Sequence, residues 1–237
     1  MAEGVPPGDG GEFGEHAPAI LSTEHWSLLS ARGLAYTESF NRVTVFLTVL
    51  SSSIVSLALV ANTTGLEEEF TWAALLLAPL VLFVGITTYV RLVQLNLDDV
   101  FTVMAMNRLR HAYVELEPKL ERYLMSGWHD DERGIIKSML LARSAMPREG
   151  SHSLVTTPTV IAIISSFVGA ALAGFVGARV GASAVLSVAI AAAVMVLMSA
   201  GLLRYQVQAT NEIRRVEPRF PSTREAYDDE LGTTPDR

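Results

Sequence analysis

Four long stretches without any ionisable side chain most constrain how this chain folds. They are residues 43–62, 70–90, 157–178 and 183–203, and none contains Asp, Glu, Lys, Arg or His. A helix of about 20 such residues rises about 30 Å, which is the thickness of the hydrocarbon core of a bilayer. The rest of a 237-residue chain is too small to bury four such helices away from water. We therefore predict an all-α integral membrane protein with four transmembrane helices.

The basic residues predict the orientation of these helices. The segments 63–69 and 179–182, which follow the first and third apolar runs, hold only Arg179 of the 18 Lys and Arg residues. Positive residues stay on the cytoplasmic side of a membrane. We therefore expect two transmembrane hairpins, with both termini in the cytoplasm. No cleavable signal peptide is expected, so the first apolar run should direct insertion.

Turn residues and helix breakers divide the remaining sequence. Ser22 can cap a helix that continues into the first apolar run, and nothing breaks a helix between 86 and 117. Sequences rich in Gly, Pro and acidic residues favour disorder at the two ends. The expected segments are disordered tails at 1–21 and 218–237, an amphipathic helix, hairpin and long cytoplasmic helix in 22–117, a cytoplasmic helical segment at 118–156, and a hairpin with a helical extension in 157–217.

Apolar residues at helical spacing continue outside the four runs. Val93, Leu97, Val100 and Met104 recur at intervals of four, three and four, which favours packing against a partner helix. The segment 23–42 also has an apolar face. It either lies at the membrane surface or continues upright into the first run, and the sequence leaves both possibilities open.

Hydroxyl side chains form a line in the first apolar run, because four of them fall four residues apart and share one helix face. One interpretation is the wall of a pore in an oligomer. The simpler one is helix packing, since hydroxyl residues are favoured where membrane helices touch and can bond to carbonyls of their own helix. Two aspartates on the long helix either form an acidic ring in such an oligomer or are solvated charges. The candidate pore-lining residues are Thr44, Thr48, Ser52, Ser56, Asp98 and Asp99.

Small residues in the third apolar run form two neighbouring stripes at a spacing of four. Together they make a broad face that allows close approach of another helix, and the fourth run also has small residues on two sides. The second hairpin should therefore be tightly packed. The predicted helix-packing residues are Ser166, Gly169, Ala170, Ala173, Gly174 and Gly177.

The sequence does not predict an enzyme. The absence of intramembrane charge argues against ion-coupled transport and intramembrane proteolysis, and no nucleotide-binding or hydrolase motif is present. His129, Asp130 and Asp131 are the best candidates for a weak metal site. The preferred interpretation is that the two aspartates cap a helix and that His129 is solvated. We therefore predict no catalytic residue, metal or cofactor.

Two blocks, "LSTEHWSLLSARGLAYTESFNRVTVFLTVLSSS" at 21–53 and "RLVQLNLDDVFTVMAMNRLRHAYVELEP" at 91–118, resemble a group of uncharacterised bacterial multi-spanning integral membrane proteins. The resemblance implies location in a bacterial cytoplasmic (inner) membrane and no activity. We expect a non-catalytic, homo-oligomeric membrane protein that acts through helix packing and binds a cytoplasmic partner or further copies of itself. The alternative is an ion or small-solute channel lined by hydroxyls of the first transmembrane helix. No nucleic acid is expected as a partner, since no basic stripe occurs.

Overall fold

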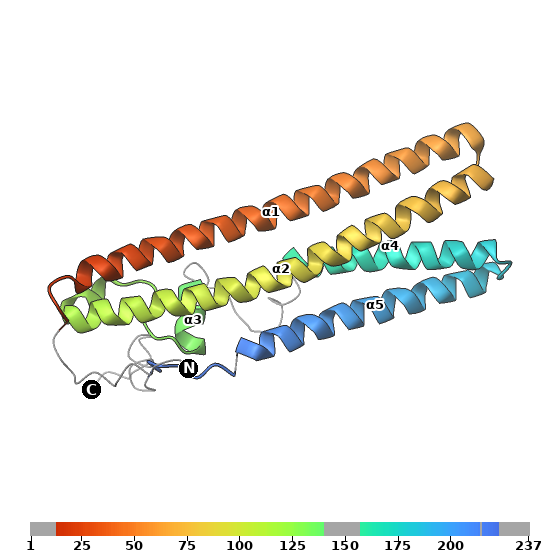
Figure 1. Cartoon of the computed structure of the whole chain (residues 1–237). Coiled ribbons are helices and arrows are strands. Elements are labelled where there is room, and N and C mark those ends of the chain that lie inside the picture. Colours follow the sequence, from red (N-terminus) through yellow and green to blue (C-terminus); the bar gives the residue numbers. More distant parts are fainter. Residues whose placement is uncertain (1–12, 140–156, 214, 223–237) are drawn as a thin grey trace, which may run out of the picture. The chain divides into compact units, whose positions relative to one another are not determined.

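The computed structural model of the chain describes residues 13–139, 157–213 and 215–222 (Figure 1). Helices and no β-strands make up the regular secondary structure of these residues, with turns and irregular segments between them. Four of the helices are long and apolar enough to cross a membrane, which is compatible with a multi-pass membrane protein. The chain divides into two compact units. Unit 1 contains the described residues of Met1–Gly33, Val100–Ala145 and Glu217–Arg237, and unit 2 contains those of Leu34–Asp99 and Met146–Val216.

The first helix, α1 (Ala17–Thr64), is unbroken over 48 residues. It begins before Ser22, so the expected N-cap was wrong and residues 17–21 of the expected tail are helical, while residues 1–12 lie outside the described residues. Pro18 falls in the first turn, where backbone N–H groups have no partner within the helix, so its missing N–H costs no helical hydrogen bond. The backbone N–H of Ala17 donates to the carbonyl of Gly14 at 2.8 Å. The segment 23–42 is therefore one helix with the first apolar run.

The second helix, α2 (Glu68–Leu116), has 49 residues and contains Pro79. Gly65 lies between α1 and α2 with φ of 71°, a left-handed conformation that glycine adopts without strain. Glu68 and Glu69 occupy the first turn of α2, where negative charge stabilises the helix dipole. The helix ends before Pro118, as its sequence predicted. A 3₁₀-helix, η1 (Pro118–Tyr123), and a short helix, α3 (Glu132–Met139), follow it.

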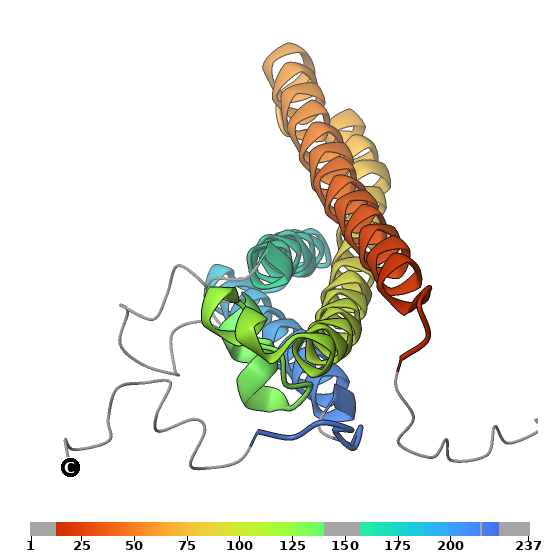
Figure 2. The same ribbon diagram turned by 90° about the vertical axis from the view of Figure 1, so that its left-hand side faces the viewer.

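The helices α4 (Thr157–Arg179) and α5 (Ala184–Ile213) pack along each other in unit 2 (Figures 1 and 2). Their connection contains Gly181, whose φ of 87° also lies in the left-handed region. A Cβ atom added to Gly174 would lie 3.0 Å from the Cβ atom of Ala191, so the two helix backbones approach closely. Small residues make this approach possible.

The core of unit 2 is built from α1, α2 and α4. Phe46, Tyr89 and Ile161 are at most 1% exposed, and they pack with Val81, Leu92, Val93 and Ala162. The Tyr89 hydroxyl donates a hydrogen bond to the backbone carbonyl of Leu202, which ties α2 to α5. Gly85 lies against Ser165 and Phe46, and a Cβ atom there would overlap the Ser165 hydroxyl and lie 2.9 Å from Phe46.

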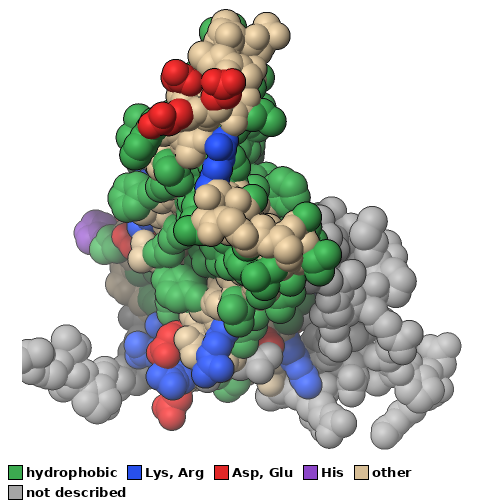
Figure 3. Space-filling model, turned by 90° about the vertical axis from the view of Figure 1, so that its right-hand side faces the viewer, with side chains coloured by type: hydrophobic (Ala, Val, Ile, Leu, Met, Phe, Trp, Pro, Cys, Tyr) green, Lys and Arg blue, Asp and Glu red, His purple; other side chains and the backbone are tan. Residues whose placement is uncertain are grey.

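The turn between α1 and α2 is fastened to the end of α4. The Arg179 guanidinium donates a hydrogen bond to the backbone carbonyl of Leu66 at 2.6 Å and also lies over the ring of Phe175, 5.3 Å from its centre. Figure 3 shows acidic side chains gathered near a basic one among mostly apolar surroundings, and the sequence supplies Glu67, Glu68 and Glu69 at this turn. The one basic residue of 179–182 therefore binds backbone carbonyls.

Unit 1 has a smaller core, in which Val103 and Met104 of α2 pack with Ile135 of α3. Residues 217–222 belong to this unit, although the sequence predicted a disordered tail from 218 onward. Residues 218–222 differ from this expectation because backbone amides of 219, 220 and 222 bind aspartate side chains of the segment before α3, while residues 223–237 lie outside the described residues. Pro218 and Pro221 remove backbone donors that a helix would need, so this segment is available for such contacts.

Candidate functional site

The most constrained polar group of unit 1 is the carboxylate of Asp130, which is 1% exposed. It accepts hydrogen bonds from the backbone N–H groups of Arg219 at 2.9 Å and Phe220 at 2.7 Å, and from the guanidinium of Arg108 at 2.7 Å. Burial alone would raise the pKa of Asp130. The three donors outweigh burial, so its pKa lies below the ordinary value. Asp130 therefore stays charged and holds the C-terminal segment.

Asp131 completes this contact, which we call the C-terminal clasp and define as Asp130 and Asp131 with residues 219–222. One oxygen of Asp131 accepts a hydrogen bond from the backbone N–H of Gly134 at 2.8 Å and so caps α3. The other accepts bonds from the backbone N–H and the hydroxyl of Ser222. Burial again opposes these donors, and the pKa of Asp131 is still lowered. One carboxylate thus serves a helix end and the clasp together.

Aromatic rings and imidazoles cover the clasp. The His111 ring stacks on Phe220 with the ring centres 4.1 Å apart, and Trp128 packs on His129 at 3.9 Å. His129 Nδ1 lies 3.2 Å from the carbonyl oxygen of Phe220. Burial lowers the pKa of His111, even though Glu115 favours its charged form. These contacts make His129 a partly buried packing residue, so its expected solvation was wrong.

The same neighbourhood is poorly suited to a metal ion. The carboxylates of Asp130 and Asp131 already accept the donors of the clasp, and within the described ranges no group of three or more His, Cys, Asp or Glu side chains is placed to hold one. Of the two aspartates expected to cap a helix, Asp131 caps α3, whereas Asp130 binds Arg108 and the C-terminal segment. Asn107 adds a further link, since its amide donates to the carbonyl of His129 at 2.7 Å.

The hydroxyl line of α1 faces outward from the chain. Thr44, Thr48, Ser52 and Ser56 are all exposed, while the neighbouring Ser53 is buried. The hydroxyls of Thr44 and Thr48 donate to carbonyls four residues earlier in α1, at 2.9 and 2.8 Å. Two of the four candidate pore-lining hydroxyls therefore bond within their own helix.

The two aspartates proposed for an acidic ring lie apart from this line along the chain, on α2. Asp99 accepts a hydrogen bond from the Tyr36 hydroxyl at 3.4 Å, which joins α1 and α2 in unit 2. Asp98 is exposed, and its charge favours the protonated form of Arg91. Both aspartates therefore have interactions within one copy of the chain.

The small residues of α4 lie largely inside unit 2. Four of the six predicted packing residues are buried, and the other two are half-buried. A Cβ atom added to Gly169 would lie 2.5 Å from the sulfur of Met198 in α5, and one added to Gly177 would lie 3.5 Å from Ile190. The buried residues are Ser166, Gly169, Ala170 and Gly177, and the half-buried ones are Ala173 and Gly174.

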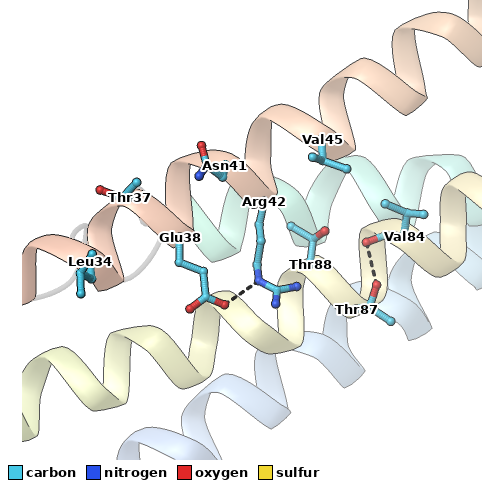
Figure 4. Close-up of a pocket in the computed structure, with 9 residues that line it drawn as sticks. All are labelled: Leu34, Thr37, Glu38, Asn41, Arg42, Val45, Val84, Thr87 and Thr88. Atoms are coloured by element: carbon cyan, nitrogen blue, oxygen red, sulfur yellow. Dashed lines mark hydrogen bonds and ion pairs between the residues drawn. The ribbon is translucent and has the colours of Figure 1, made fainter. Parts of the chain in front are cut away.

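A pocket of about 530 Å³ lies between α1 and α2 in unit 2 (Figure 4). One part of its wall is charged, and the rest carries hydroxyls and aliphatic side chains. Figure 4 shows Glu38 and Arg42 extending from α1 and joined by a hydrogen bond, at 2.9 Å from Arg42 Nε to Glu38 Oε1. The lining residues are Leu34, Thr37, Glu38, Asn41, Arg42, Val45, Val84, Thr87 and Thr88.

Two guanidinium groups share the carboxylate of Glu38. Arg91 of α2 donates through Nε at 2.8 Å and through Nη2 at 2.9 Å, and Arg42 donates through Nε. The hydrogen bonds from Arg91 and then Arg42 lower the pKa of Glu38 to about 2. The carboxylate is therefore ionised at neutral pH, and the three residues together carry one excess positive charge.

Sequence reasoning missed this cluster, although a signal for it exists. Arg42 directly precedes the apolar run 43–62, and Arg91 directly follows the run 70–90. In two antiparallel helices joined by a short turn, residues at these two boundaries lie at the same level. The partner Glu38 lies one turn before Arg42 and could be found in the same way.

No protein-family model, curated protein or solved structure matches this chain. The resemblance of 21–53 and 91–118 to uncharacterised bacterial membrane proteins therefore stays a prediction.

Proposed function

We propose that this chain is a non-catalytic integral membrane protein that assembles with copies of itself and binds a cytoplasmic partner through its helices. In this proposal, its four apolar helices cross the bacterial inner membrane as two hairpins. Both termini and residues 91–156 lie in the cytoplasm. The distribution of Lys and Arg supports this orientation, because only Arg179 lies in the two short segments assigned to the outside.

One observation carries the self-assembly proposal: α5 has two small-residue faces, and one chain uses only one of them. Ser187 is buried and Ala191 half-buried on the side that packs on α4. Ala189, Ala193 and Gly201 are exposed, and nothing lies within 4 Å of a Cβ atom added to Gly201. Only 6% of the most apolar window of α5 is buried, against 39% for α4. Exposed small residues of this kind favour the close approach of another membrane helix.

The polar groups support a structural role. The carboxylates of Asp130 and Asp131 are fully engaged in the clasp, and the hydroxyls of Thr44 and Thr48 bond to their own helix. Catalysis needs a reactive group held next to a base or an electrophile. The sequence candidates lie instead in contacts that stabilise the fold.

A pair of matched substitutions tests self-assembly. Ala193→Phe places a large ring on the free small-residue face of α5, whereas Val188→Phe places one on another exposed part of the same helix. We expect light scattering in mild detergent, and cross-linking in bilayers, to show an oligomer for the unsubstituted protein and for Val188→Phe. Ala193→Phe should yield a smaller species. A monomeric unsubstituted protein in bilayers, or an Ala193→Phe oligomer of unchanged size, would contradict the proposal.

The absence of cysteine allows a clean test of orientation. Glu67→Cys and Lys119→Cys each introduce one thiol, in the α1–α2 turn and in η1. In intact cells, a membrane-impermeant maleimide should label Glu67→Cys and not Lys119→Cys, and both should react after lysis. The reverse pattern would invert the topology, and the same result for both thiols in intact cells would contradict their placement on opposite sides of a membrane.

A channel is the second candidate, and the exposure of the whole hydroxyl line on α1 favours it. Four hydroxyls that face away from one chain can line a shared pore when several copies surround an axis. Single-channel recording in planar bilayers tests this function. Conductance that falls with Ser52→Leu and survives Ile54→Leu, on the opposite side of α1, supports a pore. A silent bilayer with an intact oligomer supports the non-conducting protein.

A further inference from the structure

The pocket between α1 and α2 has charged residues at one end and aliphatic residues at the other, and helix packing alone does not explain this arrangement. Its polar part lies just before the apolar run of α1, and Thr87 and Thr88 lie at the end of the apolar run of α2. Val45 and Val84 continue its wall into the two runs. The pocket therefore joins a charged region to an apolar one at the border of the proposed membrane-spanning segments.

The charges of this region leave a cation without a full partner. Glu38 is bound by both Arg91 and Arg42, and the charge of Asp98 acts on Arg91 as well, so Arg42 shares its carboxylate partner with a second guanidinium group. Arg91 uses two nitrogen atoms on Glu38, whereas Arg42 uses Nε. Among the described residues, no acceptor is bound to the two terminal nitrogens of Arg42, whose side chain is 44% exposed. These nitrogens form a planar pair of donors that matches a phosphate group.

The surroundings of Arg42 favour a lipid phosphate over a soluble one. A free anion would gain nothing from the aliphatic side chains of Val45 and Val84. The volume of about 530 Å³ lies within the range of ligand pockets, which is roughly 300–1,000 Å³. The cytoplasmic leaflet of a membrane presents anionic headgroups to basic residues at this level.

We infer that this pocket binds an anionic phospholipid of the cytoplasmic leaflet, with the phosphodiester on the terminal nitrogens of Arg42 and the start of an acyl chain along Val45 and Val84. Glu38 orients Arg42 by holding its Nε, and Arg91 keeps Glu38 in place. The inference rests on the proposed membrane location and orientation. It does not depend on self-assembly.

Native mass spectrometry of the protein in detergent, titrated with phosphatidylglycerol or with phosphatidylcholine, tests the site. We expect tighter retention of phosphatidylglycerol. Arg42→Gln should weaken its binding by about ten- to a hundred-fold, because one charge-assisted contact is lost. Arg204→Gln removes an exposed arginine beyond the apolar run of α5 and should leave the affinity unchanged. Thermal unfolding shows whether Arg42→Gln remains folded, and Arg42→Lys, which keeps the charge without the planar donors, should bind with intermediate affinity.

A second variant separates lipid from soluble phosphate. Val45→Asn changes an exposed part of the apolar wall and should weaken phosphatidylglycerol binding without affecting Arg42. Millimolar inorganic phosphate should compete poorly. Equal retention of the two lipids, phosphatidylglycerol binding unchanged by Arg42→Gln, or full competition by inorganic phosphate would overturn the inference. A protein that proved soluble without detergent would instead overturn the membrane assignment itself.

Discussion

The carboxylate of Asp130 accepts a hydrogen bond at 2.7 Å from the backbone N–H of Phe220, a residue 90 positions later in the chain. The contact joins the loop before α3 to the segment after α5. It is buried and charge-assisted, and it is reinforced by the N–H of Arg219 and the side chain of Arg108. Hydrogen bonds to a buried charge are among the stronger polar contacts in proteins. This one explains why residues 219–222 are placed in unit 1.

Asp130→Asn should loosen the clasp, because the neutral amide loses the charge that strengthens three hydrogen bonds and presents only one acceptor oxygen. The loss of about 1.5–3 kcal/mol corresponds to roughly ten- to a hundred-fold less protection of the clasp amides from exchange. Hydrogen–deuterium exchange of a peptide covering 217–222 measures it. Glu69→Gln, which removes an exposed acid in the first turn of α2, is the control. Unchanged protection in Asp130→Asn would show that the clasp does not hold this segment.

The clasp should weaken in two steps as the pH falls. Burial lowers the pKa of His111 below its ordinary 6.5, against the opposing effect of Glu115. An open clasp therefore binds a proton more readily than the closed one. The contribution of neutral His111 to the stability of the closed clasp is complete above pH 6.5. It is lost as the pH falls through the lowered pKa of His111. The pKa values of Asp130 and Asp131 also lie below their ordinary 3.8, so a second loss follows in more acidic solution.

Trp128 fluorescence reports these steps, because its ring lies 5.2 Å from that of His111. Trp26→Phe and Trp72→Phe remove the other two tryptophans. The groups that surround His111 are Glu115 of α2, Trp128, His129 and Asp130 of the loop, and Phe220 of the C-terminal segment. His111→Gln should abolish the step nearer neutrality and retain the acidic one. Two unchanged steps in this variant would assign the first to another group.

Gly85→Ala should destabilise unit 2 by about 1–3 kcal/mol, the cost of overpacking a filled core. The new Cβ atom would meet the Ser165 hydroxyl and the ring of Phe46, which are both held in a buried cluster. Gly33→Ala in α1 is the matched control, since nothing lies within 4 Å of its added Cβ atom. That control should raise helix stability by about 0.5–1 kcal/mol. Thermal unfolding in detergent separates the two, and equal shifts would contradict the packing described here.

Tyr89→Phe should cost about 0.6 kcal/mol, the average of interhelical hydrogen bonds inside membrane proteins. The Tyr89 hydroxyl donates to the carbonyl of Leu202 and is the link between α2 and α5 that a phenyl ring cannot replace. Tyr205→Phe removes the hydroxyl of a nearby exposed residue and should be neutral. Unfolding in detergent by a chemical denaturant compares the variants. If Tyr205→Phe proved the more destabilising of the two, the link would lie elsewhere.

The helices were largely predictable because their signals are local. Four uncharged runs gave the four long apolar helices, and Pro118 marked the end of α2. The start of α1 was missed because Pro18 was assigned to a tail, although a first helical turn accepts proline. The small residues of α4 predicted close approach to α5 without showing which residues would meet.

The polar contacts were harder to predict from the sequence than the helices, since each joins distant segments of the chain. Glu38 and Arg91 are separated by 53 positions, and Asp130 and Phe220 by 90. No periodicity links such pairs. The predicted stripe from Val93 to Met104 is divided between two clusters, because Val93 packs in unit 2 and Met104 packs with Ile135 in unit 1. An apolar stripe indicates that its residues are buried, but it does not indicate which segments they pack against.

The hydrogen bond from Arg179 to the carbonyl of Leu66 spans 113 positions of the chain. During synthesis on the ribosome, the turn after α1 therefore emerges long before the residue that fastens it. Until translation reaches the end of α4, the carbonyls of this turn must be satisfied by water. The hydrogen bond that fixes this turn therefore forms only after the second half of the polypeptide has been synthesised.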